Sequence, residues 1–315
     1  MRVLVTGANG FVGRAVCERF VRAGAAVHAA VRAPGRAVAS GAIPCVVGDL
    51  GAATDWKAAL EGVDVVVHLA GRVHQMRDTA DDSLAAYREV NRVGTERLAR
   101  AAARSGAKRL VFMSTVKVVG EGRGEPYTER DVPAPVDPYG ISKWEAEQAL
   151  TQVAAETGLE VAILRPPLVY GPSVGANFLK LLQWVWSRLP LPFGSVRNRR
   201  SLVYVGNLAD AVHATASLSL DSPRTFFVSD GEDVSIPELV RRIGIVLGRP
   251  ARLVPVPAGV IRTAARLVGR PDAAERLVGS LAVDSTLLRT TTGWRAQFTL
   301  DEGLQATAAW FRERG

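Results

Sequence analysis

The chain has 315 residues, of which 48% are hydrophobic and 22% are charged, as in a folded globular protein and unlike a disordered one. It contains no run of about 18 or more apolar residues, and its amino-terminal apolar stretch is too short for a signal peptide. The two cysteines, Cys17 and Cys45, do not make a disulfide framework. The sequence therefore predicts a soluble cytoplasmic protein with no membrane partner and no metal site.

The net charge of +8 could attract nucleic acid, an acidic membrane surface or small phosphorylated ligands. The arginines are scattered along the chain and form no basic run or arm. No nucleic-acid partner is therefore expected.

Short valine-rich runs alternate with helical patterns through the first half of the chain. Strands are expected at residues 3–6, 26–31, 44–47, 63–69, 108–114 and 159–165. Helices are expected at 11–23, 83–105 and 138–157, among others. Nearly continuous apolar strands that alternate with helices indicate right-handed crossovers and strands covered on both faces. The expected fold class is therefore α/β, with a doubly wound parallel sheet.

The first strand runs into a glycine-rich loop that opens the first helix. Gly7 permits a tight turn, Gly10 lets the backbone approach a pyrophosphate, and Gly13 lets helix and strand pack closely. The helix N-terminus also offers free N–H groups to phosphates. The loop predicts a Rossmann-like fold that binds a dinucleotide; the alternative is a glycine-rich turn without a ligand. The cofactor-binding positions expected here are Gly7, Asn9, Gly10, Phe11, Val12 and Gly13.

The end of the second strand bears on the choice between NAD and NADP. An acidic residue there would bind the ribose hydroxyls of NAD and repel a 2′-phosphate. Here the strand ends at Val31 and Arg32, and an arginine can pair with a phosphate. NADP(H) is therefore favoured over NAD, unless Arg32 is simply a solvated loop residue. His68 is interpreted as a packed strand-end histidine and not as an acid or base. Further cofactor contacts are expected from Asp49, Leu50, Leu69 and Ala70.

After about Gly171 the pattern changes to helices, proline-rich loops and short strands. Short strands at 201–205 and 225–229 either extend the sheet or belong to a small lid. Apolar residues at helical spacing predict a buried or substrate-covering helix at 178–189. We expect two domains. They are a dinucleotide-binding domain at 1–170, with its sheet completed near 201–230, and a smaller, mainly substrate-binding domain at 171–315.

Tyr139 and Lys143 stand four residues apart and so share one face of a helix. A nearby ammonium and a positively charged nicotinamide ring would both favour the phenolate, so Tyr139 is expected to transfer a proton near neutral pH. Ser114 and Thr115 end the fifth strand and point in opposite directions, so only one hydroxyl should face the site. Asn91 lies mid-helix, where asparagine has poor propensity. It either holds a water that links Lys143 to solvent or is a plain polar residue.

The glycine loop, Asn91, Thr115, Tyr139 and Lys143 together resemble the motifs of the extended short-chain dehydrogenase/reductase family over nearly the whole chain. Within that family the chain is most similar to the UDP-glucose 4-epimerase-type, nucleotide-sugar branch. The resemblance implies an enzyme that uses a UDP-sugar or related substrate and forms a homodimer through helices 83–105 and 138–157. It selects Thr115, Tyr139, Lys143 and Asn91 as catalytic residues and adds Tyr139, Lys143 and Pro166 to the cofactor contacts. The substrate-binding residues it implies are Thr115, Lys117, Asn177, Arg200 and Arg276.

Two departures from the motifs of related enzymes reduce the number of reactions that we expect. Sugar-nucleotide 4,6-dehydratases follow the catalytic threonine with an acidic residue, whereas Thr115 is followed by Val116, so dehydration is not expected. Family 4-epimerases place an acidic residue at the end of the second strand, where this chain has Val31. We therefore expect an NADPH-dependent reductase of a UDP-linked 4-keto-hexose, in which Tyr139 protonates the oxygen that Thr115 positions. The alternatives are a UDP-hexose 4-epimerase, a reductase of a non-sugar ketone, and a dinucleotide-sensing regulator without chemistry.

Overall fold

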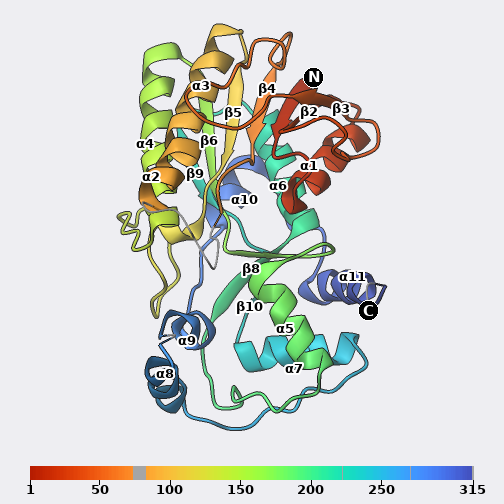
Figure 1. Ribbon diagram of the computed structural model, residues 1–315, viewed down its shortest axis with the longest axis vertical. Helices are drawn as coiled ribbons and strands as arrows, with labels where there is room; N and C mark the ends of the chain where they lie inside the picture. Colours follow the sequence, from red (N-terminus) through yellow and green to blue (C-terminus); the bar gives the residue numbers. More distant parts are fainter. Residues whose placement is uncertain (74–82, 222, 270, 314–315) are drawn as a thin grey trace.

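Seven parallel strands form the main sheet of the computed structural model, which describes residues 1–73, 83–221, 223–269 and 271–313. Their order is β3-β2-β1-β4-β5-β6-β9 (Figure 1). The strands are β1 Arg2–Thr6, β2 Ala26–Val31, β3 Ile43–Val46, β4 Val65–His68, β5 Arg109–Met113, β6 Glu160–Arg165 and β9 Arg224–Phe227. From β1 the chain adds β2 and β3 on one side of the sheet, and then β4, β5, β6 and β9 on the other side. Such a switch point opens a crevice at the carboxyl ends of the central strands. The predicted Rossmann-like, doubly wound parallel sheet is confirmed.

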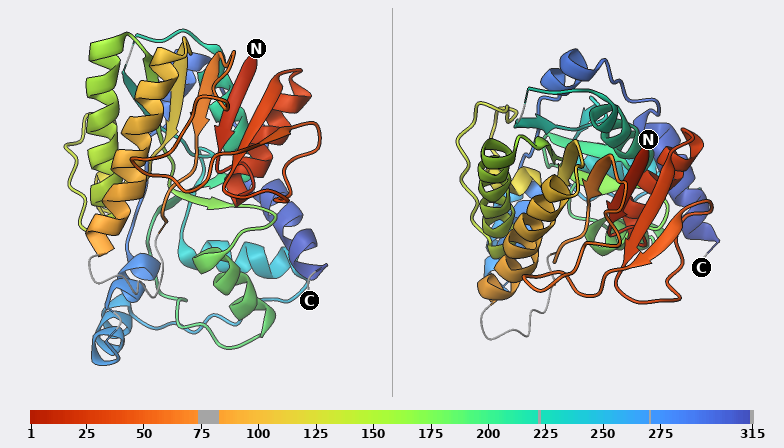
Figure 2. Two further views of the ribbon diagram at one scale, coloured as in Figure 1. Left: turned by 45° about the horizontal axis from the view of Figure 1, so that its top comes forward. Right: turned by 90° about the horizontal axis from the view of Figure 1, so that it is seen from above.

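Helices cover both faces of this sheet (Figure 2). The helix α1 (Phe11–Arg22) packs with α6 (Val205–Ser217) on one face, and α3 (Gly94–Arg104) packs with α4 (Pro138–Thr157) on the other. Adjacent residues of a strand point to opposite faces, so each strand contributes side chains to two separate hydrophobic cores. An in-register row below α1 and α6 consists of Ala29, Val5, Val67, Val111 and Ala162. The matching row below α3 and α4 consists of Leu4, Val66, Leu110 and Val161.

The expected helix at 83–105 is interrupted. It forms α2 (Ser83–Arg88), a π-helical turn at Glu89–Val93, and then α3. A π-helical turn of this kind is rare and is frequently found at a functional site. Asn91 lies within it.

A second lobe follows the sixth strand. Its sheet has the order β10-β8-β7 and is formed by β7 (Leu168–Tyr170), β8 (Arg200–Tyr204) and β10 (Asp233–Val234). Of the two late strands expected from the sequence, the one near 225 joins the main sheet as β9, whereas the one near 201 lies in this second sheet beside β7. The helices around it are α5 Ala176–Trp186, α7 Ile236–Val246, α8 Ala258–Leu267, α9 Pro271–Val278 and α11 Leu300–Arg312. The short α10 (Thr286–Thr292) returns to the main sheet next to β9.

The second lobe has a core of its own, which contains Tyr170, Phe178, Leu182, Leu239 and Leu304. The glycine loop touches it, because the half-buried Phe11 packs against this core. In the part of the chain that the structure describes, none of the helices could span a bilayer.

Candidate active site

The glycine loop is held so tightly that two of its positions exclude any side chain. Gly7 has a φ of +66°, and a Cβ placed on it would lie 2.9 Å from the backbone nitrogen of Ala70. A Cβ on Gly13 would lie 2.0 Å from the carbonyl oxygen of Gly7. Gly10 begins α1 with no side-chain cap, and the first turn of α1 carries no acidic residue. The backbone N–H groups at the start of α1 therefore remain for a phosphate, and the loop fits the pyrophosphate of a dinucleotide.

The buried His68 helps to hold the backbone that follows β4, opposite the glycine loop. The hydroxyl of Thr6 accepts from the backbone N–H groups of Leu69 and Ala70 at 3.2 and 3.1 Å and lies 2.7 Å from Nδ1 of His68. Because both acceptor sites of the hydroxyl are used, it donates to Nδ1, and Nε2–H of His68 faces the hydroxyl of Thr95 at 2.9 Å. Burial, with the nearby charge of Lys143, lowers the pKa of His68 to about 3. His68 is thus a neutral packing residue that positions Leu69 and Ala70, two of the expected cofactor contacts.

Arg32 and Asp49, both expected to contact the cofactor, lie against each other. Arg32 Nε is 2.9 Å from a carboxylate oxygen of Asp49, and the two side chains are 77% and 84% exposed. The arginine predicted to meet a 2′-phosphate therefore already has an anionic partner. Leu50, the next expected contact, packs half-buried against the core below α3.

The two hydroxyls at the end of β5 have different partners. Ser114 donates a hydrogen bond to the buried carboxylate of Glu147. Thr115 caps a short 3-10 turn at Val116–Val118, and its hydroxyl is close enough to Tyr139 to lower the pKa of that phenol. Thr115 is therefore the hydroxyl that shares the site with Tyr139, and Ser114 points into the core.

Tyr139 lies in the first turn of α4, which begins after the N-cap Asp137. The carboxylate of Asp137 accepts from the backbone N–H of Gly140 at 2.6 Å. Gly140 has little room for a side chain, because a Cβ on it would lie 3.0 Å from the carbonyl oxygen of Lys117. Burial raises the pKa of Tyr139, the charge of Asp137 raises it further, and the nearby Thr115 hydroxyl opposes the rise. Burial therefore dominates in the protein alone, and the expected proton transfer by Tyr139 near neutral pH, which counts on the charge of a bound nicotinamide ring as well as the lysine, stays a prediction.

Lys143 lies one turn further along α4 and is only 4% exposed. Burial lowers its pKa to about 7, and the negative charge of Glu147 only partly opposes this. Its Nζ lies 4.1 Å from the centroid of the Phe112 ring. A Cβ on Gly71 would come within 3.7 Å of Nζ and 2.9 Å of the Asn91 side-chain oxygen, so Gly71 leaves the space above both residues open.

The buried side-chain amide of Asn91 connects two parts of the site. Its oxygen accepts from the backbone N–H of Arg72 at 2.8 Å. Its nitrogen donates to the carbonyl of Arg72 and to the hydroxyl of Ser142, both at 2.9 Å. Ser142 in turn donates to the carbonyl of Tyr139 at 2.8 Å. In the protein alone, Asn91 therefore joins the segment after β4 to the helix that carries Tyr139.

A buried ion pair below α4 was not predicted from the sequence. Glu147, one turn after Lys143, is 2% exposed and bonds to Arg165, which is 4% exposed at the end of β6. Pro166 follows at once, and its carbonyl accepts from the backbone N–H of Val116 at 3.0 Å. The ion pair thus connects α4 to the strand ends that carry Thr115 and Pro166. The spacing of Glu147 after Lys143 was the signal available in the sequence.

The residues expected to bind substrate are spread along the second lobe and its border. The ammonium of Lys117 bonds to Asp137 and to Glu121, the latter at 2.9 Å. Asn177 is exposed in the first turn of α5, and Arg276 is half-buried in α9. Arg200 donates to the carbonyl of Gly279 at 3.0 Å, and burial lowers its pKa.

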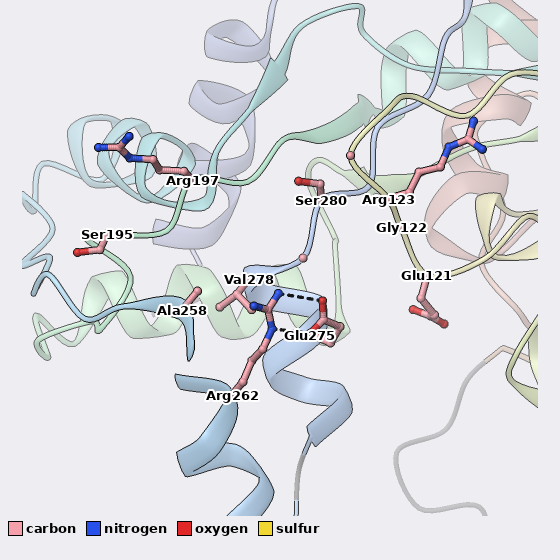
Figure 3. Close-up of a pocket in the computed structure, with 12 residues that line it drawn as sticks. Glu121, Gly122, Arg123, Ser195, Arg197, Ala258, Arg262, Glu275, Val278 and Ser280 are labelled. Atoms are coloured by element: carbon pink, nitrogen blue, oxygen red, sulfur yellow. Dashed lines mark hydrogen bonds and ion pairs between the residues drawn. The ribbon is translucent and has the colours of Figure 1, made fainter. Parts of the chain in front are cut away.

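Gly279 also lines a pocket of about 480 Å³. The pocket is formed by the loop at 121–124, residues 195–197 and the helices α8 and α9. Figure 3 shows Arg262 of α8 and Glu275 of α9 pointing toward each other at this pocket, where they form an ion pair. Arg200 therefore lies at the edge of the pocket, because it donates to Gly279, which lines it. Glu121, another lining residue, accepts a hydrogen bond from Lys117.

Comparison with known proteins identifies the family. The sequence profile of the NAD dependent epimerase/dehydratase family matches residues 3–228. The chain belongs to this family. It is therefore an enzyme of the extended short-chain dehydrogenase/reductase class, and the resemblance to the UDP-glucose 4-epimerase branch is confirmed.

Relatives in the family match the chain over its whole length. A UDP-glucose 4-epimerase of Vibrio cholerae is 42% identical over 314 residues, covering 98% of this chain and 95% of the relative. The structure of MoeE5 in complex with UDP-glucuronic acid and NAD is 25% identical and covers 100% of both chains with a TM-score of 0.80. That of the Thermus thermophilus UDP-glucose 4-epimerase complex with NAD is 26% identical and covers 99% of both chains with a TM-score of 0.78.

Proposed function

We propose that this protein is a UDP-hexose 4-epimerase that retains NAD, in preference to the NADPH-dependent 4-keto-sugar reductase expected from the sequence. The observation that carries the proposal is the 42% identity, over 98% of the chain, to a relative named UDP-glucose 4-epimerase. The NAD in two solved relatives supports the same cofactor here.

The dinucleotide would lie across the switch point between β1 and β4. The N-terminus of α1 would bind its pyrophosphate, Leu69 and Ala70 would flank it, and Tyr139 and Lys143 would contact its nicotinamide end. When bound, it supplies an acceptor for the hydride from C4 of the sugar and a positive ring charge beside Tyr139.

Proton transfer falls to Tyr139. In the protein alone its pKa is raised, so its hydroxyl keeps its proton at neutral pH. A positive charge in the site lowers that pKa and lets Oη take the proton of the C4 hydroxyl and later return it. The Thr115 hydroxyl, which lies beside Tyr139, would orient the C4 oxygen between them. Lys143, with a pKa of about 7, can hold a proton or release it near neutral pH.

The UDP part of the substrate would lie in the second lobe. We infer that Arg200 and Arg276 bind the diphosphate and that Asn177 contacts the nucleotide. The 480 Å³ pocket that Arg200 adjoins offers the room. These assignments support a cofactor domain at 1–170, with its sheet completed by β9 and covered by α6, and a smaller, mainly substrate-binding domain at 171–315. Dimerisation through the helices at 83–105 and 138–157 remains a prediction of the family resemblance.

The reductase is the second candidate, because one observation favours it. The end of β2 carries Val31 and Arg32 and no carboxylate of its own. A 2′-phosphate would have to compete with Asp49 for Arg32, so this observation supports NADP(H) only weakly.

Absorbance of the purified protein separates the two candidates. An epimerase that retains NAD gains absorbance in the reduced-nicotinamide band when UDP-glucose is added without cofactor, because part of the NAD is reduced during turnover. A protein that purifies without dinucleotide and instead consumes added NADPH with a UDP-4-keto-sugar would contradict the epimerase proposal.

A further inference from the structure

The side chain of Lys117 lies between the helix that carries Tyr139 and the loop that lines the pocket. Its ammonium bonds to the carboxylate of Asp137, the N-cap of α4, and to that of Glu121 at 2.9 Å. The Lys117 and Asp137 side chains are only 21% and 16% exposed, so salt screens this pair less than a surface pair. Glu121 lines the pocket, as Figure 3 shows. Lys117 therefore connects the start of the catalytic helix to the edge of the pocket.

The backbone of Lys117 is held against the same helix. Its N–H donates to the hydroxyl of Thr115 at 3.3 Å, within the short 3-10 turn that Thr115 caps. Its carbonyl oxygen lies so near the first turn of α4 that a Cβ on Gly140 would come within 3.0 Å of it. The turn that places Thr115 beside Tyr139 thus also presents the Lys117 side chain to Asp137.

The carboxylate of Asp137 has two partners and an effect on Tyr139. One oxygen accepts from the backbone N–H of Gly140 at 2.6 Å and so caps the helix, while the other bonds to Lys117. The negative charge of Asp137 raises the pKa of Tyr139, two residues further on. A cation fixed on the same carboxylate acts in the opposite direction, because its field at Tyr139 favours the phenolate.

Other titratable and charged groups also face Tyr139 in the described part of the chain. Lys143 lies one turn further along α4, and the Tyr87 ring of α2 lies 6.2 Å from the Tyr139 ring. The Arg72 guanidinium lies 5.4 Å from the centroid of that Tyr87 ring. His68 is neutral, and Glu147 is paired with Arg165. A substitution of Lys117 leaves all these groups in place and changes only the charge beside Asp137.

We propose that Lys117 is a positioning residue, whose ammonium holds the Asp137 cap of α4 and offsets the negative charge of that cap at Tyr139. The alternative is the substrate contact that the family resemblance implies for Lys117. The two carboxylates on the ammonium disfavour that alternative, because they would repel a substrate phosphate that approached it. The inference rests on the proposed proton transfer by Tyr139.

Titration of the Tyr139 phenolate tests the proposal without any turnover. Each protein is saturated with NAD and titrated with base, and the phenolate absorbance of its Tyr139→Phe counterpart is subtracted. Lys117→Met should raise the pKa of Tyr139 by about 0.5 to 1 unit, and Lys117→Arg, which keeps the charge, should restore the wild-type value. Asp137→Asn keeps a capping oxygen but loses the charge, so it should lower the pKa by a similar amount. The Lys117→Met/Asp137→Asn double variant should return close to the wild type.

Steady-state kinetics separate the positioning role from a substrate contact. At pH values below the pKa of Tyr139, Lys117→Met should lower kcat by about threefold to tenfold, the equivalent of that pKa shift, with KM unchanged within about twofold. Lys57→Met, which removes the same charge at an exposed lysine, should match the wild type in both experiments.

Three results would overturn the proposal. An unchanged phenolate titration in Lys117→Met, even with a lowered thermal midpoint, would show a merely structural ion pair. A KM raised about tenfold with that unchanged titration would show a substrate contact. A shift in the same direction in Lys117→Met and Asp137→Asn would show that their charges do not act on Tyr139. A wild type that epimerises no UDP-sugar would instead contradict the proposed function and would leave the phenolate titration readable.

Discussion

Replacing Lys143 with methionine should have opposite effects on two quantities: it should lower turnover and raise the free energy of unfolding. The pKa of Lys143 is about 7 in the folded protein, against an ordinary value of 10.5. One pKa unit corresponds to about 1.4 kcal/mol, so holding the ammonium in its buried position costs the folded state up to about 5 kcal/mol below pH 7. Methionine fills similar space without this cost, and Glu147 keeps Arg165 as its partner. We expect Lys143→Met to be more stable than the wild type at neutral and acidic pH.

The sign of the pH dependence follows from proton binding. Between the folded pKa of about 7 and the unfolded value of 10.5, the unfolded chain holds a proton on Lys143 that the folded protein does not. The wild type therefore gains unfolding free energy with rising pH in this window, at about 1.4 kcal/mol per pH unit, and the variant does not. The advantage of Lys143→Met is full below pH 7 and shrinks as the pH rises toward 10.5.

Urea unfolding of both proteins at about pH 6.5, 8 and 9.5 measures this difference. Lys57→Met, at an exposed lysine, is the matched control and should follow the wild-type pH profile. Turnover of Lys143→Met should fall by about 10²-fold or more, because the proton pathway at Tyr139 loses its partner. An equal difference in unfolding free energy at all three pH values would refute the reasoning.

Three further substitutions test other parts of the site. Tyr139→Phe removes the proton-transferring hydroxyl and should lower turnover by about 10²- to 10⁴-fold with an unchanged circular dichroism spectrum; a variant with full turnover would contradict the mechanism. Gly13→Ala places a Cβ 2.0 Å from a backbone oxygen and should lose bound dinucleotide and several degrees of thermal stability, whereas Gly259→Ala, with open space around it, should lose neither. Arg32→Asp should weaken binding of NADP relative to NAD in a fluorescence titration, and an unchanged ratio would show that Arg32 and its partner Asp49 do not determine the choice.

The parts of the site that follow from local backbone rules could be predicted from the sequence. Gly7 and Gly13 are glycines because the strand, loop and helix leave no room for a Cβ, and that restriction is readable from spacing alone. The same holds for Tyr139 and Lys143, since four residues are about one helical turn. The alternation of strands and helices was enough to predict the parallel sheet.

Features that depend on tertiary contacts could not be predicted. Arg32 and Asp49 come from different strand ends, and only the β2–β3 pairing brings them together, which weakens the argument for NADP made from Arg32 alone. The pKa of Tyr139 depends on its burial, which local spacing does not report.

The same limit applies to the second lobe. The α8 pattern is that of an ordinary amphipathic helix, and only the fold shows that Leu267 faces solvent. The position of β8 beside β7 and outside the main sheet is also a property of the assembled lobe.

We propose that this protein inverts C4 of a UDP-hexose with a dinucleotide it already holds. The most direct measurement incubates the purified protein, without added NAD or NADPH, with UDP-glucose, UDP-glucuronic acid and UDP-N-acetylglucosamine in turn, and follows the sugar ring by proton NMR. We expect at least one of the three UDP-sugars to convert to a mixture with its C4 epimer. The epimerase assignment is wrong if none epimerises, with or without added NAD, while NADPH reduces a UDP-4-keto-sugar.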